Sequence, residues 1–166
     1  MEENKNFQTR KSIRLKEYDY SQEGMYFITI CTQDRKCVLS EILGGSVKND
    51  PYIKLNNIGI MVEKELKKIE EHFKTIKIHD YVIMPNHIHF IIEKIIVGAG
   101  LDLPDKKIKI TNVIGLFKAD VSRRIGYSFW QRNYYEHIIR SEKELYKIKE
   151  YIQYNPLNWE KDKYNC

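Results

Sequence analysis

The sequence predicts an α+β fold, a ferredoxin-like antiparallel sheet of the order βαββαβ with an added C-terminal helix. Two observations support this prediction. Four segments rich in β-branched and aromatic residues alternate with two segments of helical periodicity, and a third helical segment follows the last strand. The chain has 166 residues, 42% of them hydrophobic, which is enough for one domain with its own core over residues 1–166.

The first half of the chain is predicted to contain a strand, a helix and a pair of strands. Residues 25–32 are apolar enough for a strand in the middle of a sheet. A stretch rich in Gly, Asn, Asp and Ser follows, and we expect a loop there. Apolar residues at three- and four-residue spacing predict an amphipathic helix over 57–73. Residues 76–84 and 87–95 are then expected to be antiparallel strands joined at Pro85-Asn86.

The second half is predicted to add a helix, a strand and a last helix. Thr111 is expected to cap a helix that ends at Gly126. A fourth strand is expected over 134–140, where residue type alone assigns no role to Glu136 or His137. The segment Ser141-Glu-Lys-Glu144 has the pattern of a capping box, and Pro156 ends the helix that follows it.

The charge and the aromatic content favour a nucleic-acid partner. The net charge is +5, and 28 Lys and Arg residues accompany twelve Tyr and two Trp. Because aromatic rings stack on unpaired bases while cations bind phosphates, this composition fits single-stranded nucleic acid better than an acidic protein. Tyrosines that only fill strands and a mixed core would explain the aromatic content about as well. A basic arm over about residues 1–24 places Arg10, Lys11 and Arg14 as predicted phosphate contacts. A frayed terminus explains these residues about as well.

No feature of the sequence predicts a membrane protein or a secreted one. No apolar run approaches the ~18 residues of a membrane span, and the first residues are too polar for a secretory signal. The three cysteines are odd in number and form no Cys-x-x-Cys pair, which argues against a structural zinc cluster and suits a reducing compartment. We therefore expect a cytoplasmic protein.

Two histidines in the third predicted strand form a candidate metal site. His87 and His89 stand two residues apart, so the period of a strand places both imidazoles on one face. Ile88 between them points to the other face. Two nitrogen ligands on a rigid strand make half of a metal site and leave coordination positions open. The ordinary alternative is a pair of histidines that only pack or form local hydrogen bonds.

The last helix carries a candidate nucleophile. Its apolar stripe is expected to pack on the sheet and consists of Leu145, Ile148 and Ile152. At about 100° per residue, Tyr151 and Asn155 lie on one flank of that stripe, one turn apart, whereas Tyr146 and Tyr154 face water. Tyr151 is therefore the tyrosine of this helix that borders the sheet, although an exposed edge residue would look the same.

A tyrosine beside a metal site has a specific chemistry. Its oxygen can attack a phosphodiester and hold the DNA end as a phosphotyrosine, which keeps the bond energy for rejoining. Since the ordinary pKa of tyrosine is ~10, about a thousandth is phenolate at neutral pH, a handicap of roughly 4 kcal/mol. A divalent cation held by two histidines and an amide oxygen would lower that barrier by polarising the phosphate.

The combination of motifs resembles the single-tyrosine HUH transposases, named for their His-hydrophobic-His strand, and within them the REP-associated tyrosine transposases. The matching segments keep their order along most of the chain and are Arg10-Lys-Ser-Ile-Arg-Leu15 with Tyr18-Asp-Tyr20, Tyr26-Phe-Ile-Thr-Ile-Cys-Thr32, Met84-Pro-Asn-His-Ile-His89, Ile114-Gly-Leu-Phe-Lys118, Trp130-Gln-Arg-Asn-Tyr-Tyr-Glu-His-Ile-Ile-Arg140 and Tyr151-Ile-Gln-Tyr-Asn-Pro156. Separated motifs in one order are far more specific than any one of them.

The resemblance implies an activity and a set of site residues. It makes Tyr151 the nucleophile, His87 and His89 the metal ligands, and Asn155 the third ligand, with Mg²⁺ or Mn²⁺ as the cation. The implied reaction is cleavage of single-stranded DNA to a 5′-phosphotyrosine and a free 3′-hydroxyl, followed by strand transfer. The implied partner is single-stranded DNA with a palindromic hairpin. The sequence leaves open whether the protein acts as a monomer or a homodimer.

Further DNA contacts and a rival function complete these predictions. The predicted phosphate contacts outside the arm are Lys118, Arg123, Arg124 and Arg132, although a solvated helix face explains most of them nearly as well. The rival is a non-catalytic nucleic-acid-binding protein on the same ferredoxin-like sheet, since such sheets bind RNA through strand aromatics. A metal hydrolase of small molecules is weaker, because the chain shows no ligand set rich in Asp and Glu.

Overall fold

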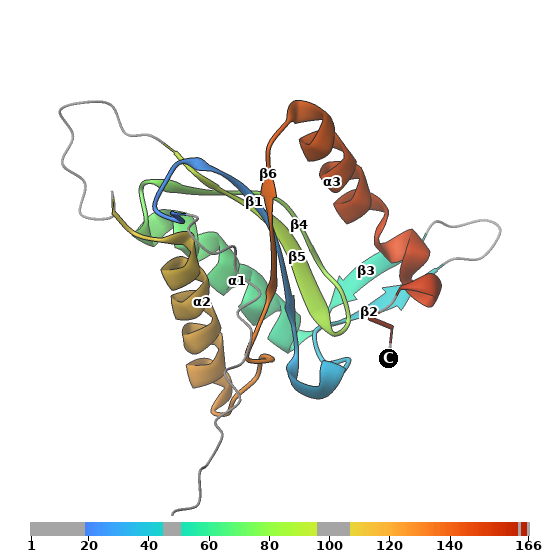
Figure 1. Ribbon diagram of the computed structural model, residues 1–166. Helices are drawn as coiled ribbons and strands as arrows, with labels where there is room; N and C mark the ends of the chain where they lie inside the picture. Colours follow the sequence, from blue (N-terminus) through green and yellow to red (C-terminus); the bar gives the residue numbers. More distant parts are fainter. Residues whose placement is uncertain (1–18, 45–50, 96–106, 163, 166) are drawn as a thin grey trace, which may run out of the picture.

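A computed structural model describes residues 19–44, 51–95, 107–162 and 164–165 (Figure 1). In chain order its elements are β1 (Gly24–Cys31), the short 3₁₀ helix η1 (Gln33–Arg35), β2 (Ser40–Leu43), β3 (Tyr52–Leu55), α1 (Asn57–His72), β4 (Ile76–Ile83), β5 (His87–Lys94), α2 (Ile110–Ile125), β6 (Tyr135–Ile139), α3 (Glu142–Tyr154) and the 3₁₀ helix η2 (Pro156–Lys161). The predicted basic arm lies outside the described residues except for its last part.

The main sheet confirms the predicted fold. Its strand order is β4-β5-β1-β6, and every neighbouring pair is antiparallel. With α1 between β1 and β4 and α2 between β5 and β6, this is the ferredoxin-like βαββαβ arrangement. Strands β1 and β5 occupy its centre, which agrees with their nearly continuous burial.

The two faces of the sheet have different neighbours. Helices α1 and α2 cover one face, and α3 lies against the other (Figure 1). On β5, Ile88, Phe90 and Ile92 belong to the larger apolar core, on the α1 and α2 side. His87 and His89 alternate with them and are buried on the α3 side. One strand therefore contributes to the core with one set of residues and presents the candidate metal ligands with the other.

Helix α3 is held by its cap and by a small second core. The Ser141 hydroxyl accepts the N–H of Glu144, which confirms the predicted cap. Ile152 of α3 is buried with Phe27 and Ile91 of the sheet. The flank of α3 that carries Tyr151 therefore has a defined position relative to β5.

Two local predictions were wrong. The segment expected to be a loop contains β2 and β3, which form a separate two-stranded sheet in which Ile42 pairs with Ile53. Both isoleucines pack against the second core, and that contact outweighs the turn-rich composition between them. Thr111 does not cap α2: the N-cap is Lys109, without a side-chain hydrogen bond. The predicted stop at Gly126 is confirmed by its φ of 92°.

None of the described helices is long and apolar enough to cross a membrane.

Two helical glycines provide a matched test of this packing. A Cβ added at Gly59 in α1 would lie 2.1 Å from the Leu39 carbonyl oxygen, whereas one added at Gly115 in α2 would meet nothing within 4 Å. We expect Gly59→Ala to lower the free energy of unfolding by about 3 kcal/mol. Gly115→Ala should raise it by up to about 1 kcal/mol because alanine favours the helix. Urea unfolding measures both, and equal effects would contradict the close approach of α1 to Leu39.

Candidate active site

The two histidines of β5 point their Nε2 atoms at each other. The Nε2 atoms of His87 and His89 are 3.0 Å apart, and both side chains are buried. Each ring is held from behind through Nδ1, His87 by Asn86 Oδ1 and His89 by Thr29 Oγ1, each at 2.8 Å. The rings therefore have fixed orientations before any ligand binds.

The Asn86 amide determines which nitrogen of His87 carries the proton. Its Nδ2 donates to the carbonyl oxygens of Arg35 and Tyr164, at 3.2 and 2.5 Å, so its Oδ1 is the atom that faces His87. Since that oxygen only accepts, Nδ1 of His87 is the donor and Nε2 presents a lone pair. The Thr29 hydroxyl can accept as well as donate, so His89 can present the same tautomer.

This geometry fits a shared cation. Two nitrogens that bind one ion at right angles, each at about 2.1 Å, stand about 3.0 Å apart. Two lone pairs at that separation repel each other unless a proton or a metal ion lies between them. The Nε2 pair of His87 and His89 is thus spaced as two neighbouring ligands of one ion would be.

Tyr151 of α3 reaches the same point. Its Oη lies 3.3 Å from His89 Nε2 in the same chain, and the two rings are 5.1 Å apart at 64°. Phe27 of β1 supports both, stacked on His89 at 25° and edge-on to Tyr151 at 86°. The Tyr151 side chain remains 42% exposed, so its hydroxyl is placed at the histidines while its ring stays open to a substrate.

The phenol is protonated near neutral pH. Burial, followed by the negative charge of Asp162, raises the pKa of Tyr151 to about 12, while a hydrogen bond from the Asn155 side chain acts in the opposite direction. Without a positive charge nearby, the phenolate is therefore scarcer than in a free tyrosine. A cation at the neighbouring histidines would oppose the effect of Asp162.

The Asn155 side chain, beside the Tyr151 phenol, has an unsatisfied oxygen. Its side chain is 1% exposed, and Oδ1 is buried without a hydrogen-bond partner among the described atoms. Its Nδ2 donates to Asp162 Oδ2 at 3.4 Å. A buried amide oxygen without a partner is costly, and a bound ion is one ordinary way in which such an atom is satisfied. The third predicted ligand thus fits a cation site as well.

The ligands that a cation would use here are uncharged. In the part of the chain that the structure describes, no group of three or more His, Cys, Asp or Glu side chains is placed to hold a metal ion. A site built on His87, His89 and Asn155 therefore depends on an amide as its third ligand. Neutral ligands leave the full positive charge of the ion for an anionic substrate.

Three further residues, which no sequence pattern indicated, surround the site. Trp159 and Tyr164 lie beside His87, with ring centroids 6.1 and 4.8 Å from its own. Asp162 binds Asn155 and also accepts the N–H of Tyr164 at 2.7 Å. All three follow Pro156, where η2 turns the chain back across the histidines. No periodicity marks a 3₁₀ helix, so only the polar and aromatic content of this segment could have indicated them.

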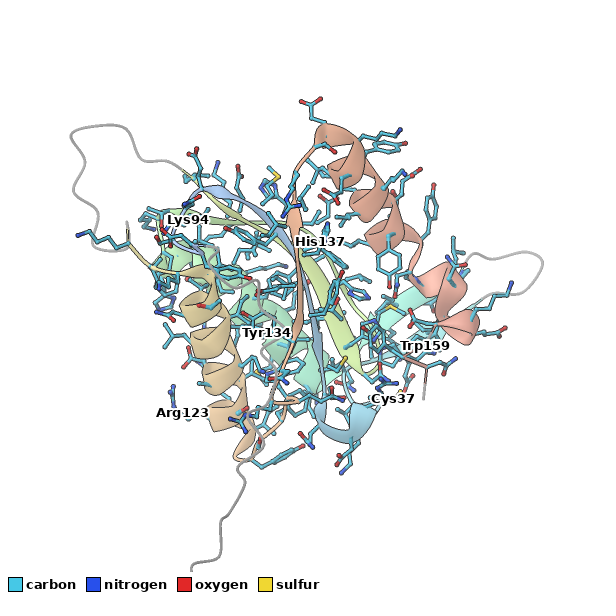
Figure 2. The ribbon with its side chains drawn as sticks, in the orientation of Figure 1. Cys37, Lys94, Arg123, Tyr134, His137 and Trp159 are labelled. Atoms are coloured by element: carbon cyan, nitrogen blue, oxygen red, sulfur yellow. The ribbon has the colours of Figure 1, made fainter. Side chains whose placement is uncertain are left out.

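The predicted DNA contacts lie in different places. Arg10, Lys11 and Arg14 fall outside the described residues. Lys118, Arg123 and Arg124 are on α2, which covers the face of the sheet opposite to the histidines, and Figure 2 shows Arg123 far from Trp159.

Each of these α2 cations has a partner. Lys118 donates to the carbonyl oxygens of Gln131 and Arg132, while Arg123 pairs with Asp120 and Arg124 with Glu65. Their role as phosphate contacts stays a prediction.

Arg132 lies closer to the site. It is exposed and follows Gln131, whose N–H donates to the carbonyl oxygen of Cys31, and Cys31 is paired with His87. Arg132 therefore belongs to the same end of the sheet as His87, and its role in DNA binding also stays a prediction.

The chain is similar to proteins of known sequence and to a protein of known structure. No family model matches it. It is 41% identical to an uncharacterised protein of Haemophilus influenzae over 92% of this chain and 91% of that one. It is 26% identical to a protein of the same organism that is provisionally assigned as a REP-associated tyrosine transposase, over 84% of this chain and 73% of that one.

A solved structure has the same fold. It is a REP-associated tyrosine transposase bound to a REP hairpin, with a TM-score of 0.62 and 19% identity over 90% of this chain and 74% of that one.

The raised pKa of Tyr151 gives a test of the site's electrostatics. Removing the Asp162 charge should lower the pKa of Tyr151 from about 12 toward the ordinary 10, but not fully, because burial is the larger cause. The pKa is measured in the Asp162→Asn protein from the pH dependence of the Tyr151 ring-carbon NMR resonance. That resonance is assigned because it is absent from Tyr151→Phe. Asp80→Asn, which removes a carboxylate paired with Lys149 of α3, is the control and should leave it unchanged. An unchanged value in Asp162→Asn would refute this role of Asp162.

Proposed function

We infer that this chain, which belongs to the family of the REP-associated tyrosine transposases, cuts single-stranded DNA and joins the cut end to another strand in a metal-dependent reaction. The observation that supports this most strongly is the approach of Tyr151 Oη to within 3.3 Å of a buried histidine pair in the same chain. A nucleic-acid-binding protein without catalysis would not need a phenol at that point.

Tyr151 is the proposed nucleophile. Its oxygen forms a bond to the phosphorus of the DNA backbone, and the bond from phosphorus to the 3′ oxygen breaks. The phenol proton passes to water, to which the partly exposed ring is open, and the departing 3′ oxygen takes up a proton as the free hydroxyl. The product is a 5′-phosphotyrosine, in which the bond from phosphorus to the tyrosine oxygen replaces the bond to the 3′ oxygen. A second 3′-hydroxyl can therefore attack this phosphorus, release Tyr151 and join a different end.

His87, His89 and Asn155 are the proposed ligands of a divalent cation, Mg²⁺ or Mn²⁺. When bound, the ion supplies a Lewis acid that polarises the phosphate and offsets the charge developing in the transition state. The residues around them fix the ligands: Asn86 and Thr29 orient the imidazoles, and Asp162 holds the Asn155 amide by its nitrogen.

The proposed substrate is DNA with a palindromic hairpin and a single-stranded arm. The related solved structure, bound to a REP hairpin, supports this substrate class. Because Tyr151 Oη lies 3.3 Å from His89 Nε2 of the same chain, the geometry supports a site formed within one chain. A cytoplasmic location is part of this proposal.

The nucleophile is tested by covalent capture. The protein is incubated with Mn²⁺ and a hairpin oligonucleotide that carries single-stranded arms, and adducts are separated on a denaturing gel. We expect an adduct with the unmodified protein, none with Tyr151→Phe and none in the presence of a chelator. The control Tyr146→Phe changes a 64% exposed tyrosine of the same helix. It should form the normal amount of adduct. An adduct on Tyr151→Phe would rule out this nucleophile.

The metal site is tested without catalysis. A ligand that binds only the folded protein stabilises it by about 2.7 kcal/mol at a hundred times its Kd, so Mn²⁺ should raise the unfolding temperature. The gain should vanish in His87→Ala and persist in His79→Ala, which removes a histidine of β4 that is paired with Glu93. The same gain in all three proteins would show that Mn²⁺ binds elsewhere.

A further inference from the structure

A cleft of about 490 Å³ opens beside Tyr151, between β6 and α3. Phe27, Thr29 and His89 of the sheet line it together with Tyr151, so the candidate active site forms one of its ends. Figure 2 shows His137 of β6 in the space between β6 and α3. The volume lies within the range of small-ligand sites in proteins. The space is therefore large enough for part of a substrate that extends past the reacting phosphate.

One wall of the cleft offers an aromatic surface. Tyr135 of β6 is 52% exposed, and its ring stands edge-on to Phe27 at 6.3 Å and 69°. Phe27 also meets Tyr151 edge-on, so the two tyrosines flank the same phenylalanine. Ile148 of α3 adds an apolar contact on the opposite wall. An exposed aromatic ring facing an apolar side chain suits the flat face of an unpaired base.

Lys147 is the charged group of the cleft that is available to an anion. Glu144 is the carboxylate that lines it, and its two oxygens already accept His137 Nε2 at 2.6 Å and the N–H of Arg140 at 2.8 Å. Lys147 of α3 is exposed at the same cleft and forms no ion pair with any other described residue. A phosphate can therefore meet a free ammonium group while the carboxylate is occupied.

We propose that this cleft binds one unpaired nucleotide of the DNA strand next to the phosphate that Tyr151 attacks, with its base against Tyr135 and a phosphate on Lys147. The inference rests on the proposed function and specifies its substrate. Stacking requires a base that is not paired, so the cleft takes the single-stranded arm and not the stem of the hairpin. Tyr135 is then a residue of the protein that determines specificity for the DNA strand next to the cut.

Binding to Tyr151→Phe protein isolates this contact from cleavage. The probe is the tightest-binding oligonucleotide selected by that protein from hairpins with randomised single-stranded arms. Each arm position in turn is replaced by an abasic residue, and fluorescence anisotropy gives the Kd. We expect one position where loss of the base weakens binding about tenfold, the scale of one stacked base.

The second half of the experiment couples that position to Tyr135. Adding Tyr135→Ala to the Tyr151→Phe protein should weaken binding of the intact probe by a similar factor and remove its sensitivity to the abasic residue. Tyr135→Phe keeps the ring and should bind normally, while Tyr146→Ala of α3, outside the cleft, should keep the full abasic penalty. Lys147→Ala should reduce the salt dependence of binding by about one unit of slope, and Lys143→Ala should not.

The results separate the cleft from the nucleophile. If the abasic penalty and the effect of Tyr135→Ala simply add at every position, the base does not lie on Tyr135 and the inference is wrong. If coupling is found but the unmodified protein forms no adduct, the cleft stands and the proposed chemistry of Tyr151 fails. If an adduct forms without coupling, only the cleft is refuted.

Discussion

The contact between Tyr151 Oη and His89 Nε2 is the interaction on which the candidate site depends. It joins the last helix to a central strand of the sheet, and it exists because α3 docks on the second apolar core through Ile152, which is buried with Phe27 and Ile91. Burial of one such side chain contributes about 2 kcal/mol, so the docking is secured by a few contacts and by the Ser141 cap. The same Phe27 supports the histidine and the tyrosine.

The alternation of β5 lets a small protein build this site without weakening its main core. Ile88 and Phe90 bury one face against α1 and α2, while His87 and His89 use the other face at no cost to that packing. The polar face is also satisfied from behind, since Asn86 and Thr29 bind the imidazoles. Two Nε2 atoms 3.0 Å apart and the Asn155 amide oxygen, which is buried without a hydrogen-bond partner among the described atoms, are the groups that a cation would join there.

Periodicity predicted the parts of the site that lie on regular elements. The period of two placed His87 and His89 on one face, and the helical period placed Tyr151 beside the apolar stripe, as the structure confirms. Periodicity could not reveal Asp162, because it acts from the end of a 3₁₀ helix through a contact with Asn155. It also missed β2 and β3, whose four residues each are too short for a pattern and are held by the second core. The start of α2 was misplaced because Thr111 has the residue type of a cap, but the chain enters the helix at Lys109.

In the proposed site, one chain brings a phenol and two imidazoles to a single cation. The most direct measurement is a crystal structure of the protein soaked in Mn²⁺, with the ion located by its anomalous scattering. We expect one peak bonded to Nε2 of His87 and His89 and adjacent to the Tyr151 oxygen of the same chain. A peak elsewhere would show that the two histidines do not form the cation site, and a tyrosine supplied by another molecule would show that one chain does not complete it.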